Sequence, residues 1–101
     1  MTPVNSDTRT DARTTTAVAT LTVRYFAAAR AAAGTTSETV EVPAGTSVDE
    51  LAETLAARHG AELAKVLPRC SYLVDEVAVR DRTLGLTHGA TVDVLPPFAG
   101  G

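Results

Sequence analysis

Several kinds of residue are scarce in this 101-residue chain, and each scarcity excludes a class of structure. Cys70 is the single cysteine, so no disulfide can form within the chain, as is usual in a reducing cytoplasm. Apolar runs are broken within about ten residues, which is too short to cross a bilayer. The first residues lack the basic and apolar regions of a secretory signal. We therefore expect a cytoplasmic protein with no membrane segment.

Positive charge is also scarce. Nine Lys and Arg residues stand against 12 Asp and Glu, which gives a formal net charge of −3. The sequence therefore lacks the basic footprint that nucleic acids and anionic membranes attract. The hydrophobic content of 45% and charged content of 21% are ordinary for one small globular domain.

The sequence contains no recognisable motif of a catalytic or metal site. There is no glycine-rich phosphate loop. The possible metal ligands His59, Cys70 and His88 fall in separate predicted elements, without the close pairing of a metal site. Ser47 and Ser71 have no nearby base that would activate either hydroxyl. The sequence thus predicts no self-contained catalytic centre.

The chain divides into three parts. Residues 1–17 are rich in Thr, Asp and Arg and have few apolar side chains, so we expect a disordered extension. Residues 18–95 carry the alternating and helical patterns of a folded domain, and residues 96–101 form a tail. The predicted strands are 20–26, 38–42, 71–74, 77–80 and 90–95, with a helical turn at 27–33 closed by Gly34.

One main helix is predicted to begin after Ser47, where Ser47 and Glu50 have the spacing of a capping box. Its apolar residues recur at helical spacing and form one stripe: Val48, Leu51, Ala52, Leu55 and Ala56. A single amphipathic helix covers one face of a sheet, so the order of elements predicts an α+β roll. We expect the other face, with Arg24, Phe26, Asp93 and Leu95, to be free for a partner.

The tail, residues 96–101, has the composition of an extended segment that could enter a narrow channel in another protein. Pro96 and Pro97 stiffen the chain, and Gly100 and Gly101 have no side chain to obstruct a narrow channel. Six extended residues reach about 20 Å. We interpret the carboxylate of Gly101 as the reactive group, to be activated by adenylation and converted to a thiocarboxylate.

Two segments carry a resemblance to a known family. Residues 23–34, Val-Arg-Tyr-Phe-Ala-Ala-Ala-Arg-Ala-Ala-Ala-Gly, and residues 95–101, Leu-Pro-Pro-Phe-Ala-Gly-Gly, resemble the small subunit of molybdopterin synthase. The similarity covers about residues 20–101 and is greatest to the mycobacterial-type second copy of that subunit. It implies a ubiquitin-like β-grasp fold, with a mixed five-stranded sheet and one main helix on one face.

The resemblance also implies partners. An adenylyltransferase of the ubiquitin-activating type, using ATP and Mg²⁺, would activate Gly101, and a sulfurtransferase would supply sulfur. The tail, with Phe98, Ala99 and Gly100, would thread into the large subunit of the heterotetrameric synthase. There, sulfur would pass to precursor Z (cyclic pyranopterin monophosphate) during molybdenum cofactor biosynthesis. The carrier itself would bind no stable cofactor, and catalytic residues would lie on the large subunit.

By position, the resemblance assigns Phe26, Arg30 and Leu95 to partner docking. Three alternatives stay open. The chain could be a related Gly-Gly carrier for thiamine thiazole or cysteine biosynthesis, or a β-grasp interaction module without sulfur chemistry. It could also be conjugated to lysines through Gly101.

Overall fold

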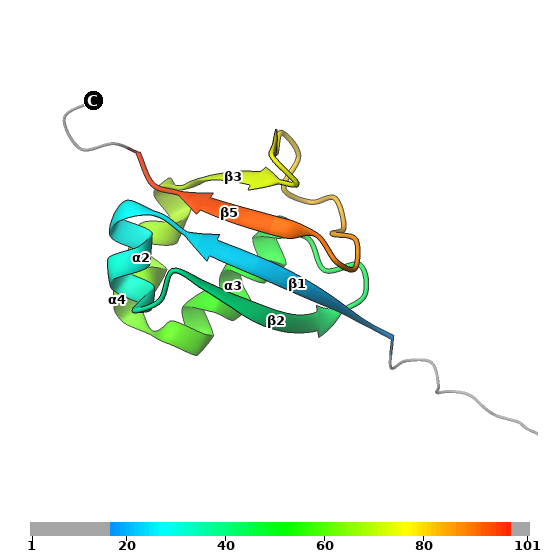
Figure 1. Ribbon diagram of the computed structural model, residues 1–101, viewed down its shortest axis with the longest axis horizontal. Coiled ribbons are helices and arrows are strands. Elements are labelled where there is room, and N and C mark those ends of the chain that lie inside the picture. Colours follow the sequence, from blue (N-terminus) through cyan, green and yellow to red (C-terminus); the bar gives the residue numbers. More distant parts are fainter. Residues whose placement is uncertain (1–16, 98–101) are drawn as a thin grey trace, which may run out of the picture.

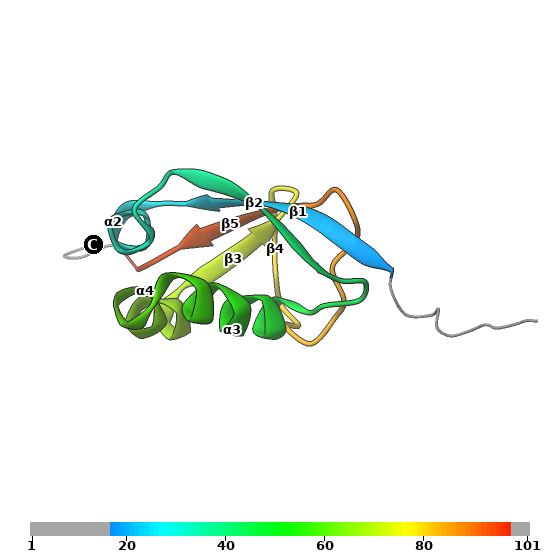
Figure 2. The same cartoon turned by 90° about the horizontal axis from the view of Figure 1, so that it is seen from below.

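The computed structural model describes residues 17–97 and shows one sheet packed on a layer of helices (Figures 1 and 2). Predictions for residues 1–16 and 98–101 lie outside the described residues. The strands are β1 (Val18–Tyr25), β2 (Ser37–Pro43), β3 (Ser71–Val74), β4 (Val77–Ala78) and β5 (Thr91–Leu95). The helices are α2 (Ala27–Ala33), α3 (Val48–His59), α4 (Ala61–Val66) and the 3₁₀ turn η2 (Leu67–Arg69).

The sheet has the strand order β2-β1-β5-β3-β4, with the first and last long strands of the chain side by side in the centre. β1 and β5 run parallel, from the Thr22–Thr91 pair to the Tyr25–Val94 pair. The other neighbouring pairs, β1–β2, β5–β3 and β3–β4, are antiparallel. The predicted mixed five-stranded sheet is therefore confirmed.

The capping box of α3 is present as predicted. The Ser47 hydroxyl accepts from the Glu50 backbone N–H at 3.1 Å, and the Glu50 carboxylate accepts from the Ser47 N–H at 3.0 Å. These bonds satisfy two donors that a helix start leaves unpaired. α3 then lies beneath the sheet, with α4 following it in the same layer (Figure 2).

The core lies between the sheet and this helical layer. Alternation along β1 buries Leu21, Val23 and Tyr25, as expected from the sequence. The predicted apolar stripe of α3 buries Val48, Leu51 and Leu55 against them, while Ala52 and Ala56 pack at its margin. Fully burying a Leu or Val side chain contributes about 1.5–3 kcal/mol, so this stripe fixes the helix on the sheet.

Some predicted elements differ from the structure. The strand predicted over 77–80 ends at Ala78. Asp93, predicted on the free face, is buried, at 4% exposure. No helix among residues 17–97 is long and apolar enough to span a membrane.

Candidate functional site

The carboxyl ends of β1 and β5 meet at one edge of the sheet, because the two strands are parallel neighbours. Phe26 directly follows β1, and Leu95 is the last residue of β5. The Phe26 N–H donates to the carbonyl of Val94 at 3.2 Å, which extends the pairing by one step beyond Tyr25. The segment entering α2 is thereby fixed beside the point where the chain leaves β5.

The chain turns sharply at this edge as it passes from β1 into helix α2. Phe26 is its N-cap residue and has an extended backbone without a side-chain cap, and Ala27 adopts a positive φ of 51°. One turn later, the Arg30 N–H donates to the Phe26 carbonyl at 3.3 Å. Gly34 closes the helix in the left-handed conformation, as predicted, and its N–H donates to the Arg30 carbonyl at 2.9 Å.

Helix α2 and the carboxyl ends of β1 and β5 lie at one end of the domain (Figure 1), and the three predicted docking residues belong to these segments. Phe26 is 38% exposed, Arg30 is exposed and Leu95 is partly buried. Their docking role stays a prediction. The predicted tail residues Phe98, Ala99, Gly100 and Gly101 lie outside the described residues.

A groove follows the chain where it leaves β5. It is lined by Ala28 of α2, by Glu62, Lys65 and Val66 of α4, by Arg69 of η2, and by Pro96 and Pro97. Pro96 is buried, so the first residue of the predicted spacer belongs to the packed body. Sequence reasoning missed the groove, since its walls come from distant elements. The spacing of Lys65 and Arg69, one helical turn apart, was the one available signal.

An ion pair occupies the sheet face that the helices leave uncovered. Arg24 of β1 and Asp93 of β5 are register partners, and the guanidinium Nε lies 2.6 Å from Oδ1 of the carboxylate. This pairing explains why Asp93 is buried, because a carboxylate removed from water needs a charged or hydrogen-bonding partner. The free face therefore does not present Asp93 to a partner, contrary to the prediction.

A second polar cluster joins β1, β2 and α3. The Glu38 carboxylate accepts from the Tyr25 hydroxyl at 2.5 Å and lies 2.5 Å from Nε2 of His59. Burial alone would raise the pKa of Glu38, but the hydrogen bonds from Tyr25 and His59 outweigh it and lower the pKa. The His59 ring, at the end of α3, thus bonds to a residue of β2. The short hydrogen-bonded contacts indicate a structural link between layers.

Cys70 is buried, and its thiol donates to the carbonyl of Val66 at 3.3 Å. Burial raises the pKa of this thiol, so it stays protonated and is a poor nucleophile. Among residues 17–97, no group of three or more His, Cys, Asp or Glu side chains could hold a metal ion.

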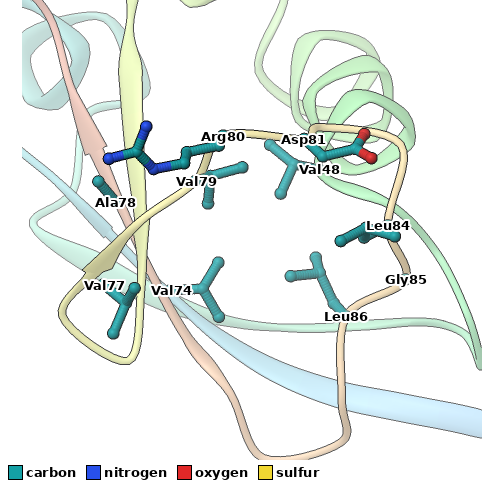
Figure 3. A pocket seen from close by; sticks show the side chains of 10 residues that line it. All are labelled: Val48, Val74, Val77, Ala78, Val79, Arg80, Asp81, Leu84, Gly85 and Leu86. Atoms are coloured by element: carbon teal, nitrogen blue, oxygen red, sulfur yellow. The ribbon is translucent and has the colours of Figure 1, made fainter.

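A further groove lies at the opposite end of the sheet, near the β3–β4 hairpin (Figure 3). Its walls are mostly apolar, with Val48, Val74, Val79 and Leu86 directed toward one another. Val77 and Leu84 border it and are exposed. It contains no converging set of ionisable groups and is remote from the carboxyl end of β5.

Comparison with known proteins agrees with the family resemblance of the sequence. Residues 23–101 match the model of the ThiS family. The molybdopterin synthase sulfur carrier subunit of Chlamydomonas reinhardtii is 32% identical over 80 residues, which cover 78% of this chain and 95% of that protein.

Two solved structures share the fold. One is a Pyrococcus furiosus protein described as subunit 1 of a molybdopterin converting factor, with a TM-score of 0.67 and 27% identity. The match covers 79% of this chain and 99% of that one. The other is a complex of subunits 1 and 2 of the Helicobacter pylori molybdopterin-converting factor, with a TM-score of 0.58 and 18% identity. That match covers 81% of this chain and 99% of the solved chain.

The sheet order, the helical layer and these neighbours define a ubiquitin-like β-grasp protein, as the sequence predicted. The chain belongs to the ThiS family, and its curated relative is a sulfur carrier subunit of molybdopterin synthase.

Proposed function

We propose that this protein carries sulfur on the carboxyl group of Gly101 for molybdenum cofactor biosynthesis. The observation that supports this most directly is the family match, which extends through Gly101. The folded part adds support, since the predicted docking residues and the exit of the chain share one end of the domain. A partner that receives the tail would thus contact the domain at the same end.

A carboxylate must be activated before sulfur can replace its oxygen. In the proposed first step, a carboxylate oxygen of Gly101 attacks the α-phosphate of ATP, which forms an acyl adenylate and releases pyrophosphate. A sulfurtransferase then supplies sulfur at the oxidation level of sulfide. The sulfur attacks the acyl carbon and displaces AMP, which leaves a thiocarboxylate. The adenylating partner holds ATP and Mg²⁺, and no cofactor need remain on the carrier.

The thiocarboxylate is then delivered to the large subunit of molybdopterin synthase, where sulfur passes to precursor Z. After each transfer, water releases the terminal carboxylate, and two transfers supply the dithiolene. The carrier contributes position, because holding the acyl group at a fixed point replaces diffusional encounter. A relative with this fold, from Helicobacter pylori, is found in a complex with subunit 2, which supports such a docking arrangement.

The test is intact-mass spectrometry after incubation with ATP, Mg²⁺, a sulfur donor and a cognate adenylyltransferase. We expect a gain of about 16 Da from replacement of OH by SH at Gly101. Removing Gly101 should abolish the gain, whereas removing residues 1–16, which precede the family match, should not. An unchanged mass with an enzyme that activates another carrier would contradict sulfur transfer, and isopeptide-linked adducts would indicate conjugation.

Function in molybdopterin synthesis requires a second measurement. The thiocarboxylated protein and a cognate large subunit should convert precursor Z to molybdopterin. Conversion of a thiazole precursor or of a cysteine precursor instead, with no molybdopterin formed, would assign the carrier to another sulfur pathway.

A further inference from the structure

The groove beside the exit of β5 combines two kinds of surface. Its apolar part comes from Ala28, the half-buried Val66 and the two prolines, Pro96 and Pro97. Lys65 lies in the last turn of α4 and Arg69 in η2, and both are exposed. Apolar walls flanked by two cations suit a chain whose side chains include both apolar groups and carboxylates.

The position of this groove is as informative as its composition. Pro97 is the last described residue of the chain and forms part of the wall. Whatever occupies the groove therefore lies alongside the start of the segment that leads to Gly101. A protein that accepts this segment must pass close to Lys65 and Arg69.

Because the whole chain is negatively charged, these two cations can orient an acidic partner as it approaches. The formal net charge is −3, so at long range the chain as a whole repels an acidic partner. Local positive charge at one end then favours approaches in which that end leads, because charge distribution steers encounter as well as contact. Glu62, on the same wall, places one negative charge at the border and restricts where carboxylates can lie.

Helix stability offers a simpler account of both cations. Basic side chains near a helix C-terminus interact favourably with the helix dipole. That account explains Lys65 and Arg69 separately. It does not explain why apolar residues from α2 and from the end of β5 form the surface between them.

We propose that this groove binds an acidic, partly apolar segment of the protein that receives the tail. The proposal rests on the proposed function only in naming the partner as the tail-receiving protein. Binding of the segment orients the carrier so that the chain beyond Pro97 faces the partner. Specificity comes from the pairing of carboxylates with Lys65 and Arg69 while apolar side chains cover Val66 and Ala28.

The first test uses a short acetylated peptide of alternating Glu and Val and amide chemical shifts of the full chain. We expect shifts concentrated at Ala28, Lys65, Val66 and Arg69. Raising the salt concentration from about 50 mM to about 500 mM should weaken binding severalfold, because exposed charges are screened. The matched peptide of alternating Lys and Val should produce no such shifts. Equal shifts with both peptides, or none with the acidic one, would overturn the proposal.

Charge reversal supplies the matched variants. Arg69→Glu should weaken binding of the acidic peptide severalfold, and Lys65→Glu combined with Arg69→Glu about tenfold. Arg80→Glu makes the same change in an exposed residue at the other end of the sheet and should leave binding unchanged. Equal loss in Arg69→Glu and Arg80→Glu would show that net charge alone matters. If the variants lose as much free energy of unfolding as free energy of binding, the cations act through the helix dipole and the proposal fails.

Inorganic phosphate provides the remaining control. If phosphate shifts the same amides at the same concentration as the peptide, the groove is a simple anion site and the proposal fails. The peptide measurements do not need sulfur chemistry, so they remain decisive if Gly101 gains no mass in the assay above. If Gly101 is converted but the peptide does not bind, the proposed function stands and this inference fails.

Discussion

Arg24 and Asp93 form two parallel hydrogen bonds across the central strand pair, Nε to Oδ1 at 2.6 Å and Nη2 to Oδ2 at 2.8 Å. The two residues are 69 positions apart in the chain and are joined by the parallel register of β1 and β5. Because the carboxylate is buried and the guanidinium is partly exposed, the two partners depend on the pair unequally.

This inequality predicts an order of stabilities. Asp93→Asn leaves Arg24 able to reach water and should cost about 1 kcal/mol, as for one hydrogen-bonded contact. Arg24→Met leaves the Asp93 carboxylate buried without its cation and should cost more. Urea denaturation at neutral pH measures both changes. A double variant, Arg24→Met with Asp93→Leu, should recover part of the loss, and a double variant less stable than Arg24→Met would contradict this explanation.

The Glu38 cluster predicts a dependence of stability on pH. The folded-state pKa of Glu38 is lowered, so its ionised form is stabilised by folding. The contribution is present above the ordinary pKa of 4.5 and is lost as pH falls through the lower folded value. Glu38→Gln should therefore destabilise the protein by about 1 kcal/mol near neutral pH. The difference from the unmodified protein should shrink below pH 4.5.

Denaturant titrations at several pH values check this dependence. Glu41→Gln is the matched control, because Glu41 is exposed on the same strand. A constant difference between Glu38→Gln and the unmodified protein across the acid range would show that hydrogen bonding by the neutral acid is sufficient.

Backbone strain at the start of α2 predicts opposite effects at adjacent alanines. Ala27 has a φ of 51°, where a Cβ atom costs roughly 1–2 kcal/mol, whereas glycine adopts that conformation without strain. Ala27→Gly should stabilise the fold by about 0.5–1 kcal/mol after the greater entropy of the unfolded glycine is included. Ala28→Gly, one residue further into the helix, should destabilise it by about 0.5–1 kcal/mol. Thermal melting of the two variants measures the signs, and the same sign at both positions would exclude local strain as the cause.

Phe26 allows docking to be separated from folding. It is 38% exposed and is the N-cap residue of α2 without a side-chain cap. Aspartate is favoured at N-caps, so Phe26→Asp should keep stability within about 1 kcal/mol. If Phe26 contacts the partner, the same change should weaken binding to a cognate large subunit at least tenfold. Isothermal titration calorimetry and thermal melting measure the two properties.

Leu95→Asp provides the comparison for Phe26→Asp. Leu95 is partly buried, so this change should also lower stability, contrary to the expectation from sequence that both sites lie fully on the outer face. Full binding by a folded Phe26→Asp variant would remove Phe26 from the docking surface.

Local patterns predicted the features that depend on neighbouring residues. The Ser47–Glu50 capping box, the Gly34 terminator and the alternation of Leu21, Val23 and Tyr25 all lie within a few positions of their partners. The resulting elements, placed in order, were enough to predict the class of fold and its single helical layer.

Features that depend on distant pairing were not predictable in this way. Burial of Asp93 follows from the register that places it beside Arg24, and no local pattern specifies that register. The contact of His59 with Glu38 likewise depends on how α3 crosses the sheet. The groove at Lys65 and Arg69 needs three elements to be assembled before its walls exist.

The central position of β5 in the sheet determines how late in synthesis the chain can fold. β5 is the strand that joins the β1–β2 ribbon to the β3–β4 ribbon, and it is made after both. Until it arrives, the earlier ribbons share no ladder, so cooperative folding must wait for nearly the whole length to be synthesised. Shortening the polypeptide before Thr91 would divide the sheet in two, whereas trimming beyond Pro97 would leave every described strand intact.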